Sequence, residues 1–588
     1  MLNFNSITRW LVVAFLAAIC IIVVKSTAAE QTLMTSVPQL LSDPFLQLPT
    51  ENSVRIVWFT EFAGSRHTVS YGKDFNQSAI ATTTKLSRTR EDQKSVVDIQ
   101  YKQPTIRNIW RHEAEVTQLN SNIRLPYRVT SVREDGKSVS SGEFTLAAKP
   151  AAGKPLKILL TSDHQLKPMT AANLQKVVET VGKVDAVFFA GDLVNIPDRA
   201  SEWFDDNRGG AFFPCLQGRA KFQLEKNNLK TTYTGGEIIQ HAPLYAAIGN
   251  HEVMGRYQKT GSLNDEFGDA YPRQAAIAQL LKQKSDRAEH SAGGDRAFVK
   301  DYSFNTDTYE EIFTLPQSEK GGKKYYAVTF GDVRLVVLYA TNIWRTPSLD
   351  KSAKGKYQER QQDINNPNEW GYGQHIFEDI SVGSPQYSWL QEELNSPQFQ
   401  QAKYKVVMLH HPPHSLGDNI VPAYTNPVQI IEPGKSVRYE YPLEQDYIIR
   451  DIVPLLEAAN AQLVFYGHSH LWNRFISSSG MHFLETSNVG NSYGAALGDK
   501  QRDVPEGNDN YAATGDPNGL EAIAPSIAPL LDKNGQKLPY LASNDITAFS
   551  ILDTATGSVI SYRFDTLKPD AEVMKFDEFK LKINTRIN

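Results

Sequence analysis

Two different patterns of hydrophobic and polar positions divide the chain. Between residues 37 and 146, short runs alternate apolar and polar side chains, and turn-forming residues separate the runs. The alternation predicts β-strands at residues 53–59, 68–71, 114–119, 127–132 and 142–146. Tyr127, near the start of one strand, fits a tyrosine corner, in which the hydroxyl bonds back to the preceding loop. The pattern predicts an all-β sandwich domain at residues 30–146.

A short Ala, Pro and Lys-rich stretch, residues 147–155, follows and has the composition of a linker. Beyond it, apolar strands are predicted at 157–161, 186–190, 244–248, 325–330, 334–339, 404–409 and 462–466. Amphipathic helices are expected between them, among others near residues 174–181, at 385–394 and at 452–459. This alternation predicts an α/β domain at 156–570, with polar insertions and a C-terminal tail at 571–588.

The first 29 residues have the order of a secretory signal. Arg9 precedes an apolar run at residues 10–24, and small residues follow at 26–29. A helix of this run reaches roughly 22 Å, short of the roughly 30 Å core of a bilayer. We therefore expect a cleaved signal peptide and a secreted or periplasmic protein, with an uncleaved membrane anchor as the alternative.

Composition excludes several classes of protein. The 61 basic and 66 acidic residues give a net charge of −5, which offers no electrostatic footprint for nucleic acid. Only two cysteines occur, Cys20 and Cys215, so neither a disulfide scaffold nor a cysteine-ligated zinc site can form. Thirteen histidines remain as candidates for chemistry.

Polar side chains suited to metal ions follow five of the predicted strands. Each taken alone fits a turn or a helix cap, but together they converge on the crevice at the carboxyl ends of the strands. The sequence therefore predicts a metal site built from Asp, Asn and His side chains. The candidates along the chain are Asp163, His164 and Gln165; Asp192 and Asn195; Asn250, His251 and Glu252; His410, His411 and His414; and His468 and His470.

These motifs resemble those of the calcineurin-like metallophosphoesterases across most of residues 155–566. The family pattern runs Asp-x-His, Gly-Asp, Gly-Asn-His-Asp/Glu, His and Gly-His-x-His, and this chain matches it around Asp163, Asp192, Asn250, His410 and His468. With a fibronectin type III-like domain in front, the architecture is most similar to that of purple acid phosphatases. The resemblance implies an α/β/β/α sandwich for the second domain.

The resemblance also implies a ligand set and a mechanism. Asp192 would bridge two ions, and the first ion would also take Asp163 and His470, whereas the second would take Asn250, His410 and His468. Oxygen and imidazole donors suit iron, manganese, zinc or magnesium. Two ions about 3.5–4 Å apart would share a bridging hydroxide that attacks the phosphoester. His251 would stabilise or protonate the leaving oxygen, and Glu252 would orient His251 from behind.

Several positions depart from the family pattern. Gln165 stands where the broad family has a ligating His, and Asn195 stands where purple acid phosphatases have a ligating Tyr, so we expect a weaker first site and no purple colour. His164 is expected to pack behind the ligands, with ligation as the alternative. His411 and His414 are the nearest candidates for contacts with substrate, and His411 fits a structural role equally well.

The sequence thus predicts an exported, binuclear metal-dependent enzyme that hydrolyses phosphate monoesters of small molecules, with Asp192 and His251 as its catalytic residues. A phosphodiesterase or nucleotidase on the same core is one alternative. A non-catalytic surface binding protein with a structural metal site is the alternative from another class.

Overall fold

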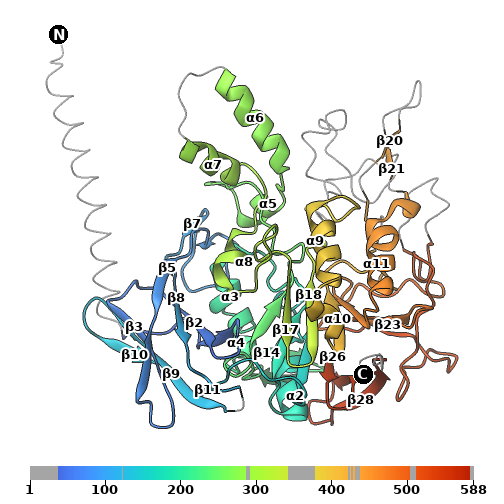
Figure 1. Cartoon of the computed structure of the whole chain (residues 1–588), viewed down its shortest axis with the longest axis horizontal. Helices are drawn as coiled ribbons and strands as arrows, with labels where there is room; N and C mark the ends of the chain where they lie inside the picture. The colour runs from blue at the N-terminus through green and yellow to red at the C-terminus, as the bar shows by residue number, and fades with distance from the viewer. Residues whose placement is uncertain are drawn as a thin grey trace.

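The computed structural model describes residues 37–582 except 122, 286–291, 342–377, 421–423, 426–427, 431–437, 441 and 503–511. Figure 1 shows an N-terminal β-region beside a larger body of sheets and helices, from which a hairpin of two helices, α6 and α7, stands out. Within the described residues, no helix has both the length and the apolar character needed to cross a membrane. The predicted export segment, residues 1–29, lies outside the described residues.

The N-terminal region consists of two antiparallel sheets, as its alternating pattern predicted. One has the strand order β1 (Phe45–Gln47), β2 (Val54–Thr60), β8 (Trp110–Val116) and β5 (Thr82–Lys85). The other has the order β10 (Ser138–Ser140), β9 (Leu125–Val132), β3 (Arg66–Tyr71) and β4 (Gln77–Ile80), with β11 (Phe144–Leu146) also paired to β9. Apolar side chains from both sheets form the core between them.

Strand β2 is buried on both faces, which explains its nearly unbroken apolar sequence. Ile56 and Trp58 belong to the core of the sandwich, whereas Val57 and Phe59 belong to the core of the α/β domain. Successive residues of a strand point to opposite faces, so one strand can serve two cores. The two domains therefore pack together over a shared hydrophobic surface.

Tyr127 lies at this junction and does not form the expected tyrosine corner. Its hydroxyl donates to Gln240 O at 2.8 Å, because the α/β domain packs where the preceding loop was expected. Gln47 bonds the same domain: its Nε2 donates to Leu244 O at 2.9 Å, and its Oε1 accepts from Thr314 N at 2.9 Å. These bonds satisfy polar groups that the junction buries.

The segment predicted as a linker, residues 147–155, is bonded to both domains. Ala148 is buried in the sandwich core, and Lys149 N donates to Thr50 O at 2.7 Å. Gly153 N donates to Asp332 Oδ1 at 2.6 Å. The connection therefore helps to fix the sandwich against the α/β domain.

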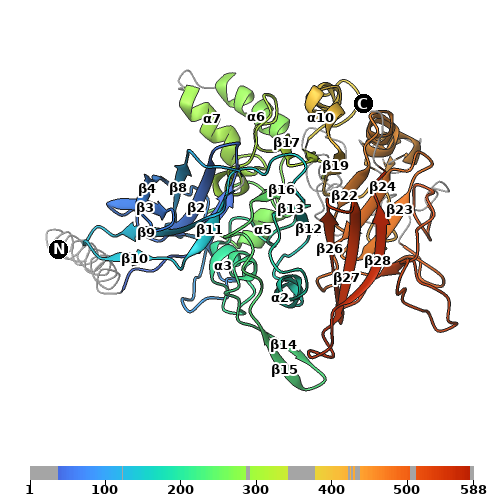
Figure 2. The same cartoon turned by 60° about the horizontal axis from the view of Figure 1, so that its bottom comes forward.

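The α/β domain has two sheets with one hydrophobic layer between them (Figure 2). The first has the order β16 (Leu244–Ala246), β13 (Ala186–Phe189), β12 (Lys157–Thr161), β26 (Ile546–Asp553), β27 (Ser558–Asp565) and β28 (Met574–Lys580). The second has the order β17 (Tyr326–Phe330), β18 (Val333–Val337), β19 (Tyr404–Met408), β22 (Leu463–Tyr466), β24 (His482–Thr486), β23 (Trp472–Ile476) and β25 (Tyr540–Leu541). Strands β12, β13 and β16 are parallel, as are β18, β19, β22 and β24.

Helices cover the sheets and complete the predicted α/β/β/α sandwich. Helix α2 (Thr170–Val181) packs Leu174 and Val177 into the first core. Helices α9 (Pro385–Leu394), α10 (Pro397–Gln401) and α11 (Val453–Ala458) pack on the second sheet through a second core. Helix α9 occupies the predicted range because Ser384 caps it, accepting from Tyr387 N at 3.1 Å, and Pro385 takes its first position.

The remaining elements lie in connections between core strands. They are the hairpins β6 (Arg90–Glu91) with β7 (Thr105–Ile106), β14 (Phe222–Lys226) with β15 (Leu229–Tyr233), and β20 (Val428–Ile430) with β21 (Arg438–Glu440); the helices α3 (Ala200–Phe204), α4 (Phe212–Leu216), α5 (Leu263–Phe267), α6 (Arg273–Ser285), α7 (Ala292–Asp301) and α8 (Asp307–Ile312); a 3₁₀ turn (Leu443–Gln445); and a π-helical turn (Ile448–Ile452) before α11.

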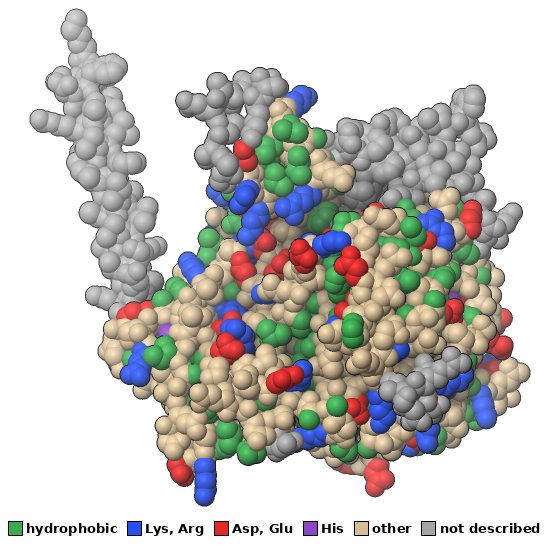
Figure 3. All heavy atoms as spheres, viewed as in Figure 1, with side chains coloured by type: hydrophobic (Ala, Val, Ile, Leu, Met, Phe, Trp, Pro, Cys, Tyr) green, Lys and Arg blue, Asp and Glu red, His purple; other side chains and the backbone are tan. Residues whose placement is uncertain are grey.

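A cavity of about 960 Å³ lies among α6, α7 and α8 and contains none of the predicted site residues. Arg273, Arg296 and Lys300 line it beside Asp307 and Glu378. Figure 3 shows Lys and Arg side chains gathered where the α6–α7 hairpin leaves the body. The mixed charges of this cavity distinguish it from the strand-end site.

The expected C-terminal tail from residue 571 is in part a core strand. Strand β28 pairs with β27 from Ser558↔Lys580 to Arg563↔Met574, and Phe576 is fully buried. The charged residues of β28 hid its strand pattern in the sequence. One of them, Asp577, is buried, and its Oδ2 lies 2.9 Å from Arg474 Nε. The α/β domain therefore extends beyond residue 570.

Candidate metal centre

The candidate site lies on five loops that leave the carboxyl ends of β12, β13, β16, β19 and β22. The first three strands belong to one sheet and the last two to the other. Six loop residues other than glycine have positive φ: Asp163 (58°), Gln165 (37°), Leu166 (54°), Asp192 (60°), His468 (86°) and His470 (56°). This backbone conformation is unfavourable for residues with a side chain and clusters at functional sites.

Asp192 contacts loops from three other strands. Its Oδ1 accepts the N–H of His251 at 2.9 Å, and its Oδ2 lies 3.3 Å from His410 Nε2. Gln165 Nε2 also donates to Oδ2, at 3.1 Å. This central position is the one that the sequence predicted for a bridging carboxylate.

Asp163 connects the first sheet to the second. Its Oδ2 accepts the N–H of His468 at 3.0 Å, and its Oδ1 lies 3.4 Å from His470 Nε2. This Oδ1 atom and Gln165 Oε1 are buried, and neither accepts a hydrogen bond. Buried oxygens without donors are costly, and a bound cation would satisfy both of them.

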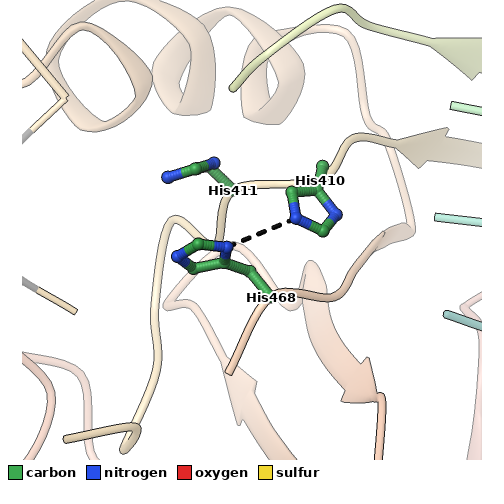
Figure 4. A group of neighbouring side chains, drawn as sticks. All are labelled: His410, His411 and His468. Carbon is green, nitrogen blue, oxygen red and sulfur yellow. Dashed lines mark hydrogen bonds between the residues drawn. The ribbon is translucent and has the colours of Figure 1, made fainter. Parts of the chain in front are cut away.

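Three imidazoles, which Figure 4 shows, and the amide of Asn250 form the other half of the cluster. His410 Nε2 lies 3.3 Å from His468 Nδ1, and Asn250 Oδ1 lies 3.1 Å from each of these atoms. His411 lies beside His468 with ring centroids 4.1 Å apart and planes tilted by 30°, and its Nδ1 bonds Thr341 Oγ1 at 3.1 Å. Ligand atoms of His410, His411 and His468 lie within 4.8 Å of one another, as do those of Asp163, Asp192 and His410.

Backbone carbonyls fix the orientation of two of these rings. His410 Nδ1 donates to Ala190 O at 2.8 Å, and His470 Nδ1 donates to Asn491 O at 2.9 Å. Each bond places the proton on Nδ1 and turns Nε2 towards a carboxylate. Histidines that ligate metals are held in this way, with one nitrogen on a carbonyl and the other on the ion.

The charges of the cluster favour a bound cation. Burial opposes ionisation of Asp192, but His410 and His251 outweigh it and hold the pKa of Asp192 well below its usual value. Burial alone would lower the pKa of His410, yet Asp192 outweighs it and raises that pKa to about 10. A metal ion would compete with this proton for the same nitrogen.

The neighbouring imidazoles are neutral. Burial, followed by the proximity of His410, lowers the pKa of His411 to about 3. Burial, followed by His411 and His410, also lowers the pKa of His468 well below 6.5. A neutral imidazole keeps the lone pair that a metal ion requires.

The donor set therefore fits two metal ions. Asp163, Asp192 and His470, with the unpartnered oxygen of Gln165, would hold the first ion; Asp192, Asn250, His410 and His468 would hold the second. Carboxylate, amide and imidazole donors suit iron, manganese, zinc and magnesium. Cys215 is buried in the hydrophobic core, where burial raises the pKa of its thiol to about 12.

His251 lies beside Asp192 and is held on two sides. Its Nδ1 donates to Asn195 O at 2.7 Å, and Phe267 of α5 stacks on its ring with centroids 5.1 Å apart. Nε2 is thus the ring nitrogen turned away from Asn195. The role expected for His251, which is to face a substrate bound at the metal ions, stays a prediction.

Glu252 lies behind the site but does not orient His251 as expected. Its carboxylate accepts the N–H groups of Gly249, Asp192 and Leu193 at 2.7–2.8 Å. Burial, followed by the charge of Asp192, raises the pKa of Glu252 to about 8. Glu252 therefore fixes the backbone of the Asp192 loop to that of β16.

The structure gives Asn195 a different place from the expected ligand position. Its side-chain Nδ2 donates to Gln165 O at 2.7 Å, and its backbone carbonyl accepts from His251. Asn195 thus connects the β12 loop to His251 through its amide and its main chain. The bond that holds His251 comes from a main-chain carbonyl, which no motif can reveal.

His164 and His414 both point away from the cluster. His164 Nε2 bonds Thr161 Oγ1 at 2.9 Å, and its ring meets Phe189 edge-on, so it packs in the core as expected. His414 Nδ1 lies 2.7 Å from Asp516 Oδ2, and its ring packs on Phe483 at 4.6 Å. The expectation that His414 contacts substrate is therefore wrong in this structure.

Sequence reasoning missed Glu485, which lies beneath the loop of His468 and His470. Its Oε1 accepts the N–H of Ser469 at 2.7 Å, and its Oε2 accepts from Ser415 Oγ and Asn473 Nδ2, each at 3.2 Å. Burial raises the pKa of Glu485 to about 8. The available signal was a single acidic residue in a strand whose side chains are all buried.

Two facing sheets whose strand-end loops bring carboxylates and imidazoles together define a metal-dependent hydrolase. The sequence model of the calcineurin-like phosphoesterases matches residues 156–471, which is more than half of the chain. The chain belongs to this family, and the predictions of the family, of the fold and of a phosphoester hydrolase are confirmed.

The other comparisons found no curated sequence relative and a structural similarity at low sequence identity. No curated protein sequence matches the chain. Among solved structures, a purple acid phosphatase from seeds of yellow lupin (Lupinus luteus) aligns with a TM-score of 0.49 and 14% identity, over 91% of this chain and 73% of that one.

Proposed function

We propose that this protein is an exported phosphatase that hydrolyses phosphate monoesters of small molecules with two metal ions. The observation that carries the proposal is the buried cluster in which Asp192 contacts His410, Gln165 and the His251 loop at once. Packing alone does not account for such a cluster, because two of its buried oxygens, Asp163 Oδ1 and Gln165 Oε1, lack donors.

The protein's own residues have separate roles in the proposed reaction. When bound, two ions supply a water of lowered pKa and offset the charge of the phosphoryl group. Asp163 and Asp192 bring the negative charge that holds the ions, and the neutral His411 lies where it can contact a phosphoryl oxygen. In its doubly protonated form, His251 keeps Nδ1–H on Asn195 O and gives its Nε2 proton to the leaving oxygen as the P–O bond breaks, which leaves the ring neutral.

Activity on two substrates tests the proposal. With manganese, iron, zinc or magnesium added, the purified protein should hydrolyse p-nitrophenyl phosphate much faster than bis-p-nitrophenyl phosphate, and Asp192→Asn should abolish both rates. Asp206→Asn, a buried carboxylate paired with Arg208 outside the five loops, is the matched control. Comparable rates on both esters would favour a phosphodiesterase, and no rate with any metal would contradict an enzyme.

Export is a separate part of the proposal, supported by the basic, apolar and small-residue order of residues 9–29. N-terminal sequencing of the protein recovered outside the cytoplasm should find a start near residue 29. A chain that keeps its first 29 residues would support an anchor instead.

A further inference from the structure

We propose that Asp92, in the N-terminal domain, is a positioning residue for His251. The inference rests on the proposed role of His251 and assigns a function to the N-terminal domain. Asp92 directly follows β6, in the connection between β6 and β7. Two separate chains of contacts run from the Asp92 carboxylate to the His251 ring. One fixes the ring nitrogen and the other fixes the ring face.

The first chain of contacts reaches His251 Nδ1. Asp92 Oδ1 accepts from Arg199 Nε at 3.2 Å and Nη2 at 3.0 Å. Arg199 Nη1 donates to Glu202 Oε1 at 2.8 Å, and Glu202 Oε2 accepts the N–H of Asn195 at 2.7 Å. The carbonyl of Asn195 then accepts from His251 Nδ1 at 2.7 Å.

The second chain of contacts reaches the face of the ring. Asp92 Oδ2 accepts the N–H of Leu263, the first residue of α5, at 2.7 Å. Helix α5 is one short turn, and its last residue is Phe267, which stacks on His251. Figure 1 shows α5 at the base of the α6–α7 hairpin, above α8. A carboxylate that fixes the start of so short a helix also fixes its end.

Arg90, two residues before Asp92, supports the same helix. Its guanidinium donates to both oxygens of Glu266, at 2.9 and 2.6 Å, and to Asp198 Oδ2 at 2.7 Å. The ring of Tyr257 covers it at 4.2 Å, and the Arg90 side chain is only 1% exposed. Charged groups buried with this many bonds have few alternative arrangements.

The test is a double-mutant cycle on the full-length protein with p-nitrophenyl phosphate and manganese. Asp92→Asn keeps the size of the side chain but weakens its bonds to Arg199 and Leu263. A displaced catalytic group costs up to about 100-fold in rate, so we expect kcat to fall 10- to 100-fold, with KM and bound manganese unchanged. In a His251→Gln background, Asp92→Asn should cause no further loss.

Asp577→Asn is the matched control, because Asp577 is also buried and bonded to an arginine, Arg474, but on β28. Its effect on kcat should be small and the same with or without His251. If Asp92→Asn does not fold, Phe267→Ala tests the second chain of contacts alone, and Phe267→Tyr should restore kcat because it restores the stack.

The outcomes separate the two proposals. Suppose that His251→Gln lowers kcat, and that Asp92→Asn or Phe267→Ala lowers kcat by the same factor in the His251→Gln protein as in the wild type. The positioning role is then wrong, and the proposed function stands. If His251→Gln leaves kcat unchanged, the role of His251 in the proposed function is wrong, and the positioning role with it.

Discussion

Two groups of buried histidines, one in the N-terminal sandwich and one on the strand-end loops, differ in what their ring nitrogens bond. His67 and His112 stack with centroids 3.6 Å apart, and all four of their nitrogens have hydrogen-bond partners inside the sandwich. His410 and His470 instead bond a main-chain carbonyl through Nδ1 and turn Nε2 towards a carboxylate.

Burial lowers the pKa of both His67 and His112, so both rings of the sandwich are neutral at neutral pH. Trp58 Nε1 donates to Ser131 Oγ at 2.9 Å, which leaves the Ser131 hydroxyl proton available for the bond to His67 Nδ1, also at 2.9 Å. His67 Nε2 then donates to Ala63 O at 2.7 Å. A pair with every donor and acceptor matched is structural, whereas a ring held on one side and turned to carboxylates on the other can bind an ion.

The largest expected effect comes from removing one of the strand-end rings. His410→Ala should lower kcat/KM on p-nitrophenyl phosphate by more than the about 100-fold typical of changes behind metal ligands. His112→Ala, the matched change in the sandwich, should reduce stability but leave kcat/KM of the folded protein near the wild-type value. Equal losses in both variants would erase the distinction between the two groups.

Removing metal should affect stability through the strand-end group alone. An ion present at 100 times its Kd stabilises the folded state by about 2.7 kcal/mol. Manganese should therefore raise the midpoint of urea unfolding of the chelator-treated protein. The full increase should remain in His112→Ala, but it should be smaller in His410→Ala, which loses a ligand of the second ion. An equal shift in both variants would place the ion elsewhere.

The next largest effects are expected from the two glutamates behind the loops, Glu252 and Glu485. Glu252→Gln should weaken manganese binding about 10- to 100-fold, because it replaces an acceptor of three backbone N–H groups. Glu485→Gln should fall near the lower end of that range, since the Ser415 and Ser487 hydroxyls can turn to donate elsewhere. Titration of manganese into metal-free protein measures both, and a larger effect at Glu485 would contradict this order.

The smallest effect concerns acid stability of the sandwich. Burial, followed by His67 and Arg111, lowers the pKa of His112 to about 3, below its ordinary 6.5. The stability this imidazole contributes is therefore complete above pH 6.5 and is lost as the pH falls, by about 1.4 kcal/mol at pH 5.5.

His112→Gln keeps an amide donor and acceptor but does not titrate. Unfolding midpoints of the two proteins between pH 7.5 and 5.5 should therefore show a shallower decline in the variant. Parallel declines would mean that His112 does not control the acid stability of the sandwich.

Local signals in the sequence predicted a large part of the fold and of the site. The amphipathic pattern predicted helix α9, and the five loops were predicted because each motif directly follows an apolar strand. Asp192, Asn250, His410 and His468 lie together as the spacing predicted. Each of these predictions depended only on residues that are close together in the sequence.

Features set by partners distant in the chain were not predictable. Tyr127 bonds a residue 113 positions away, and Asp577 in β28 pairs with Arg474, 103 positions away. Asp92 lies 107 positions from Arg199. The Tyr127 hydroxyl was expected to bond the preceding loop, and the charges of Asp92 and Asp577 are typical of surface residues. Only the tertiary fold supplies the partners that these side chains have.

The most direct test of the central claim is the number of metal ions held by the purified protein after exposure to manganese, iron and zinc. The five loops should hold two ions per chain, and Asp192→Asn should lose at least one because both ions share that carboxylate. A wild-type chain that holds no metal, or an Asp192→Asn chain that keeps two ions, would contradict the binuclear centre.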